Sequence, residues 1–415
     1  MRLLAALLLA QTISAIDVRI SGMELTSPDA VRRLMEARPG APFDSGQLEA
    51  DLARLRTLGI LYDVEASAED GPAGKRIEVR AKDRWSLVPV LGIRRGGGRT
   101  SSRVGVTDHN VFGNLFTFYA ELTSNAEIPF WSKSSADQVG NYVYLEVPRL
   151  FGTRLTPKIS WLRDFSDFAT FQRDAGPSYV YDRSRLDYRL ELRFEIVPLV
   201  TLLGGAAWRR DAFGTSDVSP NPGAPPTRAE NTSAIAGVTL GQIEEGVSLL
   251  RGTELSLTAE LGTAASTGTV QLRSFTVPWT GHNLCLQLTA QRTTGRGDAF
   301  LLRAGGQREI RGFLDAYFFG QQLLRANVEW RFDFLRTHLF VPVIGQLAAF
   351  SDLGWVSRRA DAVAGLPYEG PIVSAGVGVR GIPIPFARAV GRIDVATSVW
   401  PIRRFDVSFS GQQFF

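Results

Sequence analysis

The chain has 415 residues, of which 44% are hydrophobic and 21% charged, so it is long enough for two or three folded domains. It carries 46 Lys plus Arg against 42 Asp plus Glu without any long block of like charge, which argues against a nucleic-acid-binding tail. Its single cysteine, Cys285, and its three histidines, which are scattered, cannot assemble a Cys/His zinc site. We therefore expect no metal, no cofactor and no nucleic-acid partner.

The first 15 residues have the pattern of an export signal. Arg2 supplies the positive end, an apolar run follows from Leu3 to Ala10, and Ala15 is a small residue at the cleavage site. We expect residues 1–15 to be removed. Nowhere else do 18 apolar residues follow one another, so the exported chain is predicted to be either a soluble protein or a β-barrel.

Residues 16–87 carry mixed helix and strand signals in the order β-α-α-β-β. Ser27 followed by Pro28 predicts the start of a first helix. Asp44 with Gln47 has the spacing of a capping box at the start of a second helix, and Gly59 suits its left-handed end. These residues are predicted to form a small α+β domain.

From residue 88 to the end, helical periodicity disappears and apolar residues alternate with polar ones at period two. In residues 187–195 every second side chain is charged, and in residues 325–333 every second side chain is charged or an amide. The strands are expected to run about 9 to 12 residues, which suits a tilted bilayer crossing. We interpret the charges as the hydrated interior of a barrel rather than as an acid–base site.

Sixteen such segments can be counted, and an even number suits the closure of a membrane barrel. They are centred near residues 88, 103, 119, 143, 158, 190, 203, 236, 256, 272, 287, 326, 345, 376, 393 and 408. The last segment alternates Phe405, Val407 and Phe409 with polar residues, and Phe415 ends the chain. The predicted fold is mainly β: a 16-stranded transmembrane antiparallel barrel over residues 88–415, preceded by the small domain. Soluble β-sandwiches also alternate in this way, and that fold is the alternative.

Two short motifs stand out in the barrel region. The long connection after the eleventh strand contains Ile310, Arg311, Gly312 and Phe313. The thirteenth strand contains the pattern F-x-D-x-G, formed by Phe350, Asp352 and Gly354.

These motifs, in this order and at these strand numbers, resemble those of the BamA-like outer-membrane assembly and translocation superfamily. The unit at residues 16–87 resembles a POTRA domain, the periplasmic module of the same family, so the resemblance covers essentially the whole mature chain. It implies that the loop folds into the barrel and that Arg311 pairs with Asp352. A carboxylate fork suits a guanidinium, and Gly312 lets the loop tip turn closely against the wall.

The resemblance implies a non-enzymatic protein of the outer membrane of a Gram-negative bacterium, with its POTRA domain in the periplasm. It implies contact with outer-membrane lipid and assistance in the insertion or translocation of proteins, with an extended client polypeptide bound by β-augmentation. Only one POTRA-like unit fits before the barrel, and no catalytic motif is attached. The alternative is a passive outer-membrane pore or structural surface protein that retains the fold. Accessory subunits are not indicated by the sequence.

The seam between the first and last strands is predicted to be weak. Gly92 and Gly96 to Gly98 reduce strand propensity at one edge, and Gly411 does so at the other. In the family, a client strand adds to the edge exposed at this seam. The alternative is a fully zipped barrel in which these glycines serve only as turns at the rim.

Overall fold

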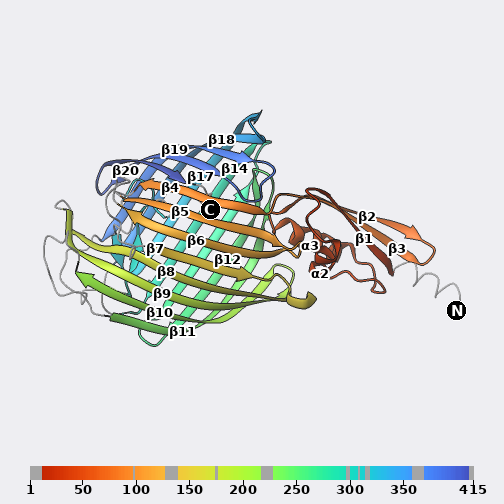
Figure 1. The fold of residues 1–415 in the computed structure, drawn as a ribbon, viewed down its shortest axis with the longest axis horizontal. Helices are drawn as coiled ribbons and strands as arrows, with labels where there is room; N and C mark the ends of the chain where they lie inside the picture. Colours follow the sequence, from red (N-terminus) through yellow and green to blue (C-terminus); the bar gives the residue numbers. More distant parts are fainter. Residues whose placement is uncertain are drawn as a thin grey trace.

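A computed structural model describes residues 12–410, except 97–98, 127–138, 173–175, 216–227, 296–299, 307–308, 314–317 and 358–368. It contains a small N-terminal domain at one end of a large curved β-sheet that wraps into a barrel (Figure 1). Among the described residues, no helix is long and apolar enough to cross a membrane.

The N-terminal domain has the predicted order β-α-α-β-β. Its elements are β1 (Ile13–Gly22), α2 (Pro28–Leu34), α3 (Ser45–Arg56), β2 (Leu61–Gly71) and β3 (Gly74–Asp83). The three strands form a sheet in the order β1-β3-β2, in which β1 runs parallel to β3. Strand β1 begins at Ile13, whose side chain is buried, so the folded domain starts three residues before the predicted boundary at residue 16. Cleavage after residue 15 would therefore remove three residues of this strand, and it stays a prediction.

Helix ends in this domain follow from local side chains, with one difference from prediction. The hydroxyl of Ser27 accepts a hydrogen bond from the backbone N–H of Asp29 at 3.2 Å, and Asp44 accepts one from Gly46 at 2.8 Å. Gln47 does not complete a capping box, because its amide donates instead to buried Asp51 at 3.1 Å. The carboxylate of Asp51 also accepts hydrogen bonds from nearby backbone N–H groups. The Gln47 amide therefore joins a buried hydrogen-bond network rather than the exposed helix end.

Sixteen strands form the large sheet, and each contains one of the predicted strand centres. They are β4 (Leu87–Gly96), β5 (Arg99–Val111), β6 (Phe116–Ala126), β7 (Val139–Glu146), β8 (Leu155–Gln172), β9 (Gly176–Val197), β10 (Val200–Thr215), β11 (Arg228–Glu245), β12 (Leu250–Gly262), β13 (Thr267–Thr276), β14 (His282–Thr293), β17 (Gln322–His338), β18 (Pro342–Ser357), β19 (Gly370–Pro383), β20 (Gly391–Trp400) and β21 (Arg404–Ser410). Every ladder is antiparallel and joins strands that follow one another in this order. The predicted range of strand lengths, about 9 to 12 residues, is too narrow, because β9 has 22 residues and β21 has 7.

The two faces of the sheet differ in the way that the period-two pattern predicts. On β9 the apolar side chains Tyr188 and Leu190 point outward and are 48% and 40% exposed. Charged neighbours such as Arg189 and Glu191 face the interior, where Arg189 pairs with Glu260 of β12. The outer face is therefore apolar and the inner face polar, as in a barrel that crosses a membrane.

Strands β4 and β21 are the two ends of the strand order, and they lie side by side. Among the described residues no hydrogen-bonded ladder joins them. Strand β21 carries Phe405, Val407 and Phe409, with Phe405 71% exposed. Residues 97–98, Gly411 and Phe415 lie outside the described residues, so their predicted roles are not addressed.

The link between β1 and α2 depends on one carboxylate. Buried Asp83 accepts four backbone hydrogen bonds, all at 2.8 Å, from Met23, Glu24, Leu25 and Thr26. Replacing Asp83 by Ala leaves these donors without an acceptor, and we expect the domain to lose about 3 kcal/mol of stability. Thermal unfolding followed by limited proteolysis of the full chain measures this loss. Replacing exposed Asp70, whose carboxylate pairs with Lys75, is the control and should have little effect.

Candidate functional site: a buried ion network and a docked domain

The connection between β14 and β17 enters the barrel interior. It contains a short antiparallel pair, β15 (Leu302–Ala304) and β16 (Phe318–Gly320), and residues 309–313 lie between them in the chain. Ile310 and Phe313 are both buried in an apolar cluster with residues of β16, β17, β18 and β19. The ring of Phe313 packs edge-on against Phe318, with 5.1 Å between centroids. Apolar contacts thus hold both sides of Arg311.

Arg311 and Asp352 are brought together in a bidentate ion pair. The Nε and Nη2 atoms of Arg311 donate to the two carboxylate oxygens of Asp352, each at 2.8 Å. The backbone N–H of Arg311 donates to the same carboxylate at 2.9 Å. The guanidinium carbon also lies 3.4 Å from the ring centroid of Phe350, so the ring covers one face of the cation. The loop motif and the motif on β18 therefore meet as the sequence predicts.

Two glycines permit this close approach. Gly312 has φ +84°, and a Cβ atom there would lie 3.0 Å from the backbone nitrogen of Ser398 on β20. A Cβ atom on Gly354 would lie 2.5 Å from Cδ1 of Ile310. The loop tip therefore packs directly against the barrel wall on two sides.

The ion pair belongs to a larger network that the sequence analysis missed. Glu329 of β17 accepts hydrogen bonds from Arg311 at 2.6 Å, from Arg331 at 2.8 Å and from Arg380 of β19 at 3.1 Å. On β20, Asp394 pairs with Arg380 and with Arg392. We call these seven side chains the interior network: Arg311, Glu329, Arg331, Asp352, Arg380, Arg392 and Asp394.

The interpretation of residues 325–333 as a hydrated surface is wrong for Glu329 and Arg331. Both side chains are 0% exposed, because residues 309–313 fill the space in front of this part of the wall. The alternating pattern identified the correct face, but it carries no information about what covers that face. The network holds four arginines against three carboxylates, and each carboxylate is paired with at least one guanidinium group, so it suits a structural role rather than acid–base chemistry.

The N-terminal domain is joined to the barrel by a second set of ion pairs. Nε of Arg54 on α3 donates to Glu195 at the end of β9 at 3.1 Å. Arg149, in the turn between β7 and β8, donates to Glu195 at 3.0 Å and also pairs with Glu36 of the N-terminal domain. Arg154 donates to the same Glu36 at 2.9 Å. We call these five side chains the docking cluster.

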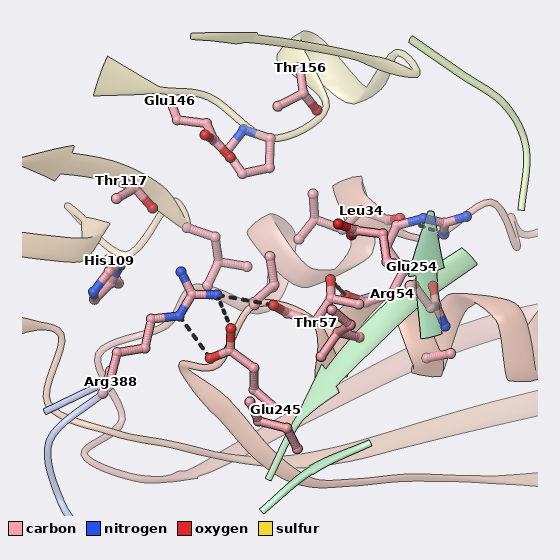
Figure 2. A pocket seen from close by; sticks show the side chains of 18 of the residues that line it. Leu34, Arg54, Thr57, His109, Thr117, Glu146, Thr156, Glu245, Glu254 and Arg388 are labelled. Carbon is pink, nitrogen blue, oxygen red and sulfur yellow. Dashed lines mark hydrogen bonds and ion pairs between the residues drawn. The ribbon is translucent and has the colours of Figure 1, made fainter. Parts of the chain in front are cut away.

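A further ion pair lies at the turn between β19 and β20. Figure 2 shows Arg388 of this turn between Glu245 of β11 and Thr57 at the end of α3. Arg388 donates to Glu245 at 2.8 and 2.6 Å, and to the backbone oxygen of Thr57 at 3.2 Å. The segment between β3 and β4 also contacts this turn, because the backbone N–H of Trp85 donates to the oxygen of Pro385 at 2.7 Å.

The turn between β5 and β6 is shared with the N-terminal domain. The backbone N–H of Ser27 donates to the oxygen of Gly113 at 3.0 Å, and Asn110 donates to the hydroxyl of Thr26 at 2.9 Å. Leu115 is buried in the apolar core of the domain. Ion pairs, backbone hydrogen bonds and apolar burial together dock the domain on this end of the barrel.

A cavity of about 1520 Å³ lies between α3 and the inner wall of the barrel. Its wall includes Arg54 on the side of the domain, and Tyr144, Glu146 and Glu254 on the side of the barrel; Figure 2 shows several of these residues. The cavity is large enough for a segment of extended polypeptide, and its lining is mixed polar and apolar.

Comparisons with known proteins agree with this architecture. Residues 15–82 match the family described as POTRA, surface antigen variable number repeat. A segment of 58 residues is 34% identical to the outer membrane protein assembly factor BamA of Nitratidesulfovibrio vulgaris, and it spans 14% of this chain and 7% of that relative. The chain thus covers only a small part of the curated relative that it matches.

Solved structures show the same fold over nearly the whole chain. CdiB from Escherichia coli aligns with a TM-score of 0.68 at 13% identity, covering 97% of this chain and 76% of that one. BamA from Haemophilus ducreyi lacking POTRA domains 1–3 aligns with a TM-score of 0.51 at 14% identity, covering 96% and 84%. The likeness at these identities is one of fold.

The pair formed by Arg311 and Asp352 gives a direct test of the interior network. Each single replacement by Ala leaves a buried charge uncompensated and should cost about 3–5 kcal/mol, and the double replacement should cost less than the sum. The temperature at which the folded, fast-migrating gel band converts to the unfolded band measures the loss. Arg228, which is exposed and pairs with exposed Glu230, is the matched control. Strict additivity of the two changes would contradict the pairing.

Glu36 makes docking sensitive to acid. Burial raises the pKa of Glu36, but hydrogen bonds from Arg154 and Arg149 outweigh this effect and lower it to about 2. Because the pKa is lowered on docking, the contribution of Glu36 is complete above its usual value of 4.5 and is lost as the pH falls toward 2.

We expect Glu36→Gln to weaken docking at neutral pH by about 1 kcal/mol and to remove the part of the pH dependence that Glu36 contributes. The distance between spin labels on β2 and β12 reports docking, with Cys285 replaced. Glu49→Gln is the control, since Glu49 pairs with Arg56 inside the domain. Equal pH profiles for the Glu36 variant and the unmodified chain would contradict the assignment.

Proposed function

This chain joins a POTRA domain to a BamA-like barrel fold, and we propose that it assists the insertion or translocation of proteins at the outer membrane of a Gram-negative bacterium. In this proposal the apolar outer face of the barrel contacts outer-membrane lipid and the POTRA domain lies in the periplasm. The whole-chain likeness to a BamA structure and the short match to an assembly factor support the proposal.

The observation that carries the proposal is the pair of strand edges at β4 and β21. They lie side by side, yet no ladder joins them among the described residues. Where no ladder joins two neighbouring edges, an extended client strand can add by β-augmentation. In a passive pore such an edge has no use and is a liability.

The remaining features suit handling of an extended chain. Strand β2 is an edge of the POTRA sheet and offers a second place for strand addition. The cavity beside α3 lies between this domain and the barrel interior. A client can thus be held by the domain, pass the cavity and reach the edges at β4 and β21.

We expect depletion of the protein to remove a defined set of proteins from the outer membrane or cell surface, as measured by comparative surface proteomics. A variant with a cysteine pair between β4 and β21, and with Cys285 replaced, should restore this set only under reducing conditions, because the disulfide holds the edges together. Each single cysteine variant is the control and should restore the set under both conditions.

The two arms of this experiment separate the alternatives. An unchanged surface proteome after depletion would favour the passive pore. A changed proteome that the locked variant restores under oxidising conditions would keep the assembly function but exclude opening between β4 and β21 as its mechanism.

A further inference from the structure

Large apolar side chains stand at the tips of five turns on the POTRA side of the barrel. These turns join β5 to β6, β7 to β8, β9 to β10, β13 to β14 and β17 to β18. The tip residues and their exposed fractions are Phe112 (94%), Phe151 (90%), Leu199 (51%), Trp279 (68%) and Phe340 (100%). Such exposure of bulky apolar groups at five turns on one side of the barrel calls for an environment other than water.

The backbone at three of these tips is strained. Phe112 and Phe151 have φ +52°, and Leu199 has φ +69°, which is the left-handed region that Gly or Asn usually occupies. Glycine would relieve this strain, and the exposed rings add little packing within the protein. Leu199 also lines the cavity beside α3, but the fold gains nothing visible from Phe112 and Phe151, which points to contact with something outside the chain.

The hairpin between β17 and β18 extends this apolar surface. Strand β14 pairs with β17 only as far as Phe332, so the end of the hairpin stands beyond its neighbour (Figure 1). A register shift follows Asp333, and Phe334 and Leu335 after it are each 46% exposed. Leu339 beside the tip is 68% exposed. We call residues 334–341 the apolar hairpin.

The only ionisable groups of the apolar hairpin are basic or neutral. Arg336 and His338 are exposed, and residues 334–341 contain no Asp or Glu. Arg336 makes no ion pair with any residue that the structure describes. Apolar side chains with a cation among them match the interface of a bilayer, where hydrocarbon lies beneath negatively charged headgroups.

We propose that these turn tips enter the headgroup layer of the phospholipid leaflet on the POTRA side, with the apolar hairpin binding anionic phospholipid through Arg336. This inference rests on the membrane placement in the proposed function but not on any client. The aromatic rings lie at the depth where a bilayer accepts both apolar and polar groups, and Arg336 reaches the phosphates. A protein partner is the other occupant that the test must distinguish.

The test uses the full chain in lipid nanodiscs, with Cys285 replaced and an environment-sensitive fluorophore on Thr337→Cys. Nitroxide-labelled phosphatidylcholine and phosphatidylglycerol serve as quenchers. We expect quenching by both lipids, with phosphatidylglycerol enriched about fivefold near the probe, as one basic residue at a charged surface produces. The same fluorophore on Glu69→Cys, which lies on β2 of the POTRA domain, is the control and should remain unquenched.

Two variants keep the outcome decisive. Arg336→Gln should abolish the preference for phosphatidylglycerol while quenching by phosphatidylcholine remains. Phe340→Ser with Leu339→Ser should reduce quenching by both lipids, while the heat-dependent gel shift shows that the barrel is folded. A probe at residue 337 that stays in water in both lipids, on a folded barrel, would overturn the inference and favour a protein partner. Failure of the folded chain to enter nanodiscs would overturn the membrane placement as well.

Discussion

Burial of Arg311 is the constraint on which the barrel interior depends. A guanidinium does not lose its proton at any physiological pH, and removing it from water is costly unless carboxylates surround it. Asp352 and Glu329 stand on two different strands, whereas Arg311 arrives on a loop. Neutralising the cation therefore requires residues 309–313 to lie inside the barrel, and the apolar contacts of Ile310 and Phe313 follow from that position.

This network stiffens one side of the barrel and leaves the neighbouring edge unsupported. Its carboxylates and guanidinium groups come from β17, β18, β19 and β20, and Gly312 packs against β20. Strand β21 is the next strand, and in the part of the chain that the structure describes it pairs with β20 through seven residue pairs. The strands that carry the interior network thus end at β20, one strand before the edge at β21. Separation of β21 from β4 therefore need not disturb the buried charges.

Much of this fold could be predicted from the sequence, because alternation along a strand is a local property. All sixteen strands follow from it, whereas the pairing of Arg311 with Asp352 was implied by the resemblance of two short motifs to those of a known family. Glu329 and Arg331 were assigned to the correct face, but their burial depends on a loop that no periodicity reports. Arg380 and Asp394 lie on strands with weak alternation, and the contact of Arg380 with Glu329 reaches across β18, which lies between their two strands.

Docking of the N-terminal domain could not be predicted for a related reason. Arg149 and Arg154 come from one turn and Arg388 from another turn far along the chain, and each resembles an ordinary exposed arginine. They acquire partners only when the barrel brings these turns to one end. The capping interpretation of Gln47 failed similarly, because its amide donates to buried Asp51 and does not accept from the N–H groups at the helix start.

The two charge networks differ in burial, and this difference assigns them different roles. The interior network is almost completely buried, so water and salt screen it little and its loss leaves uncompensated charge. In the docking cluster, Arg149 is 4% exposed, but Arg154 is 40% and Glu36 24% exposed, so the pair of Arg154 with Glu36 can exchange for water at small cost. A polypeptide that reaches the cavity therefore contacts α3, whose docking contacts are partly exposed to water. The interior network, which is buried, lies further inside the barrel. Rearrangement of this protein is consequently easier at the POTRA end than at the loop.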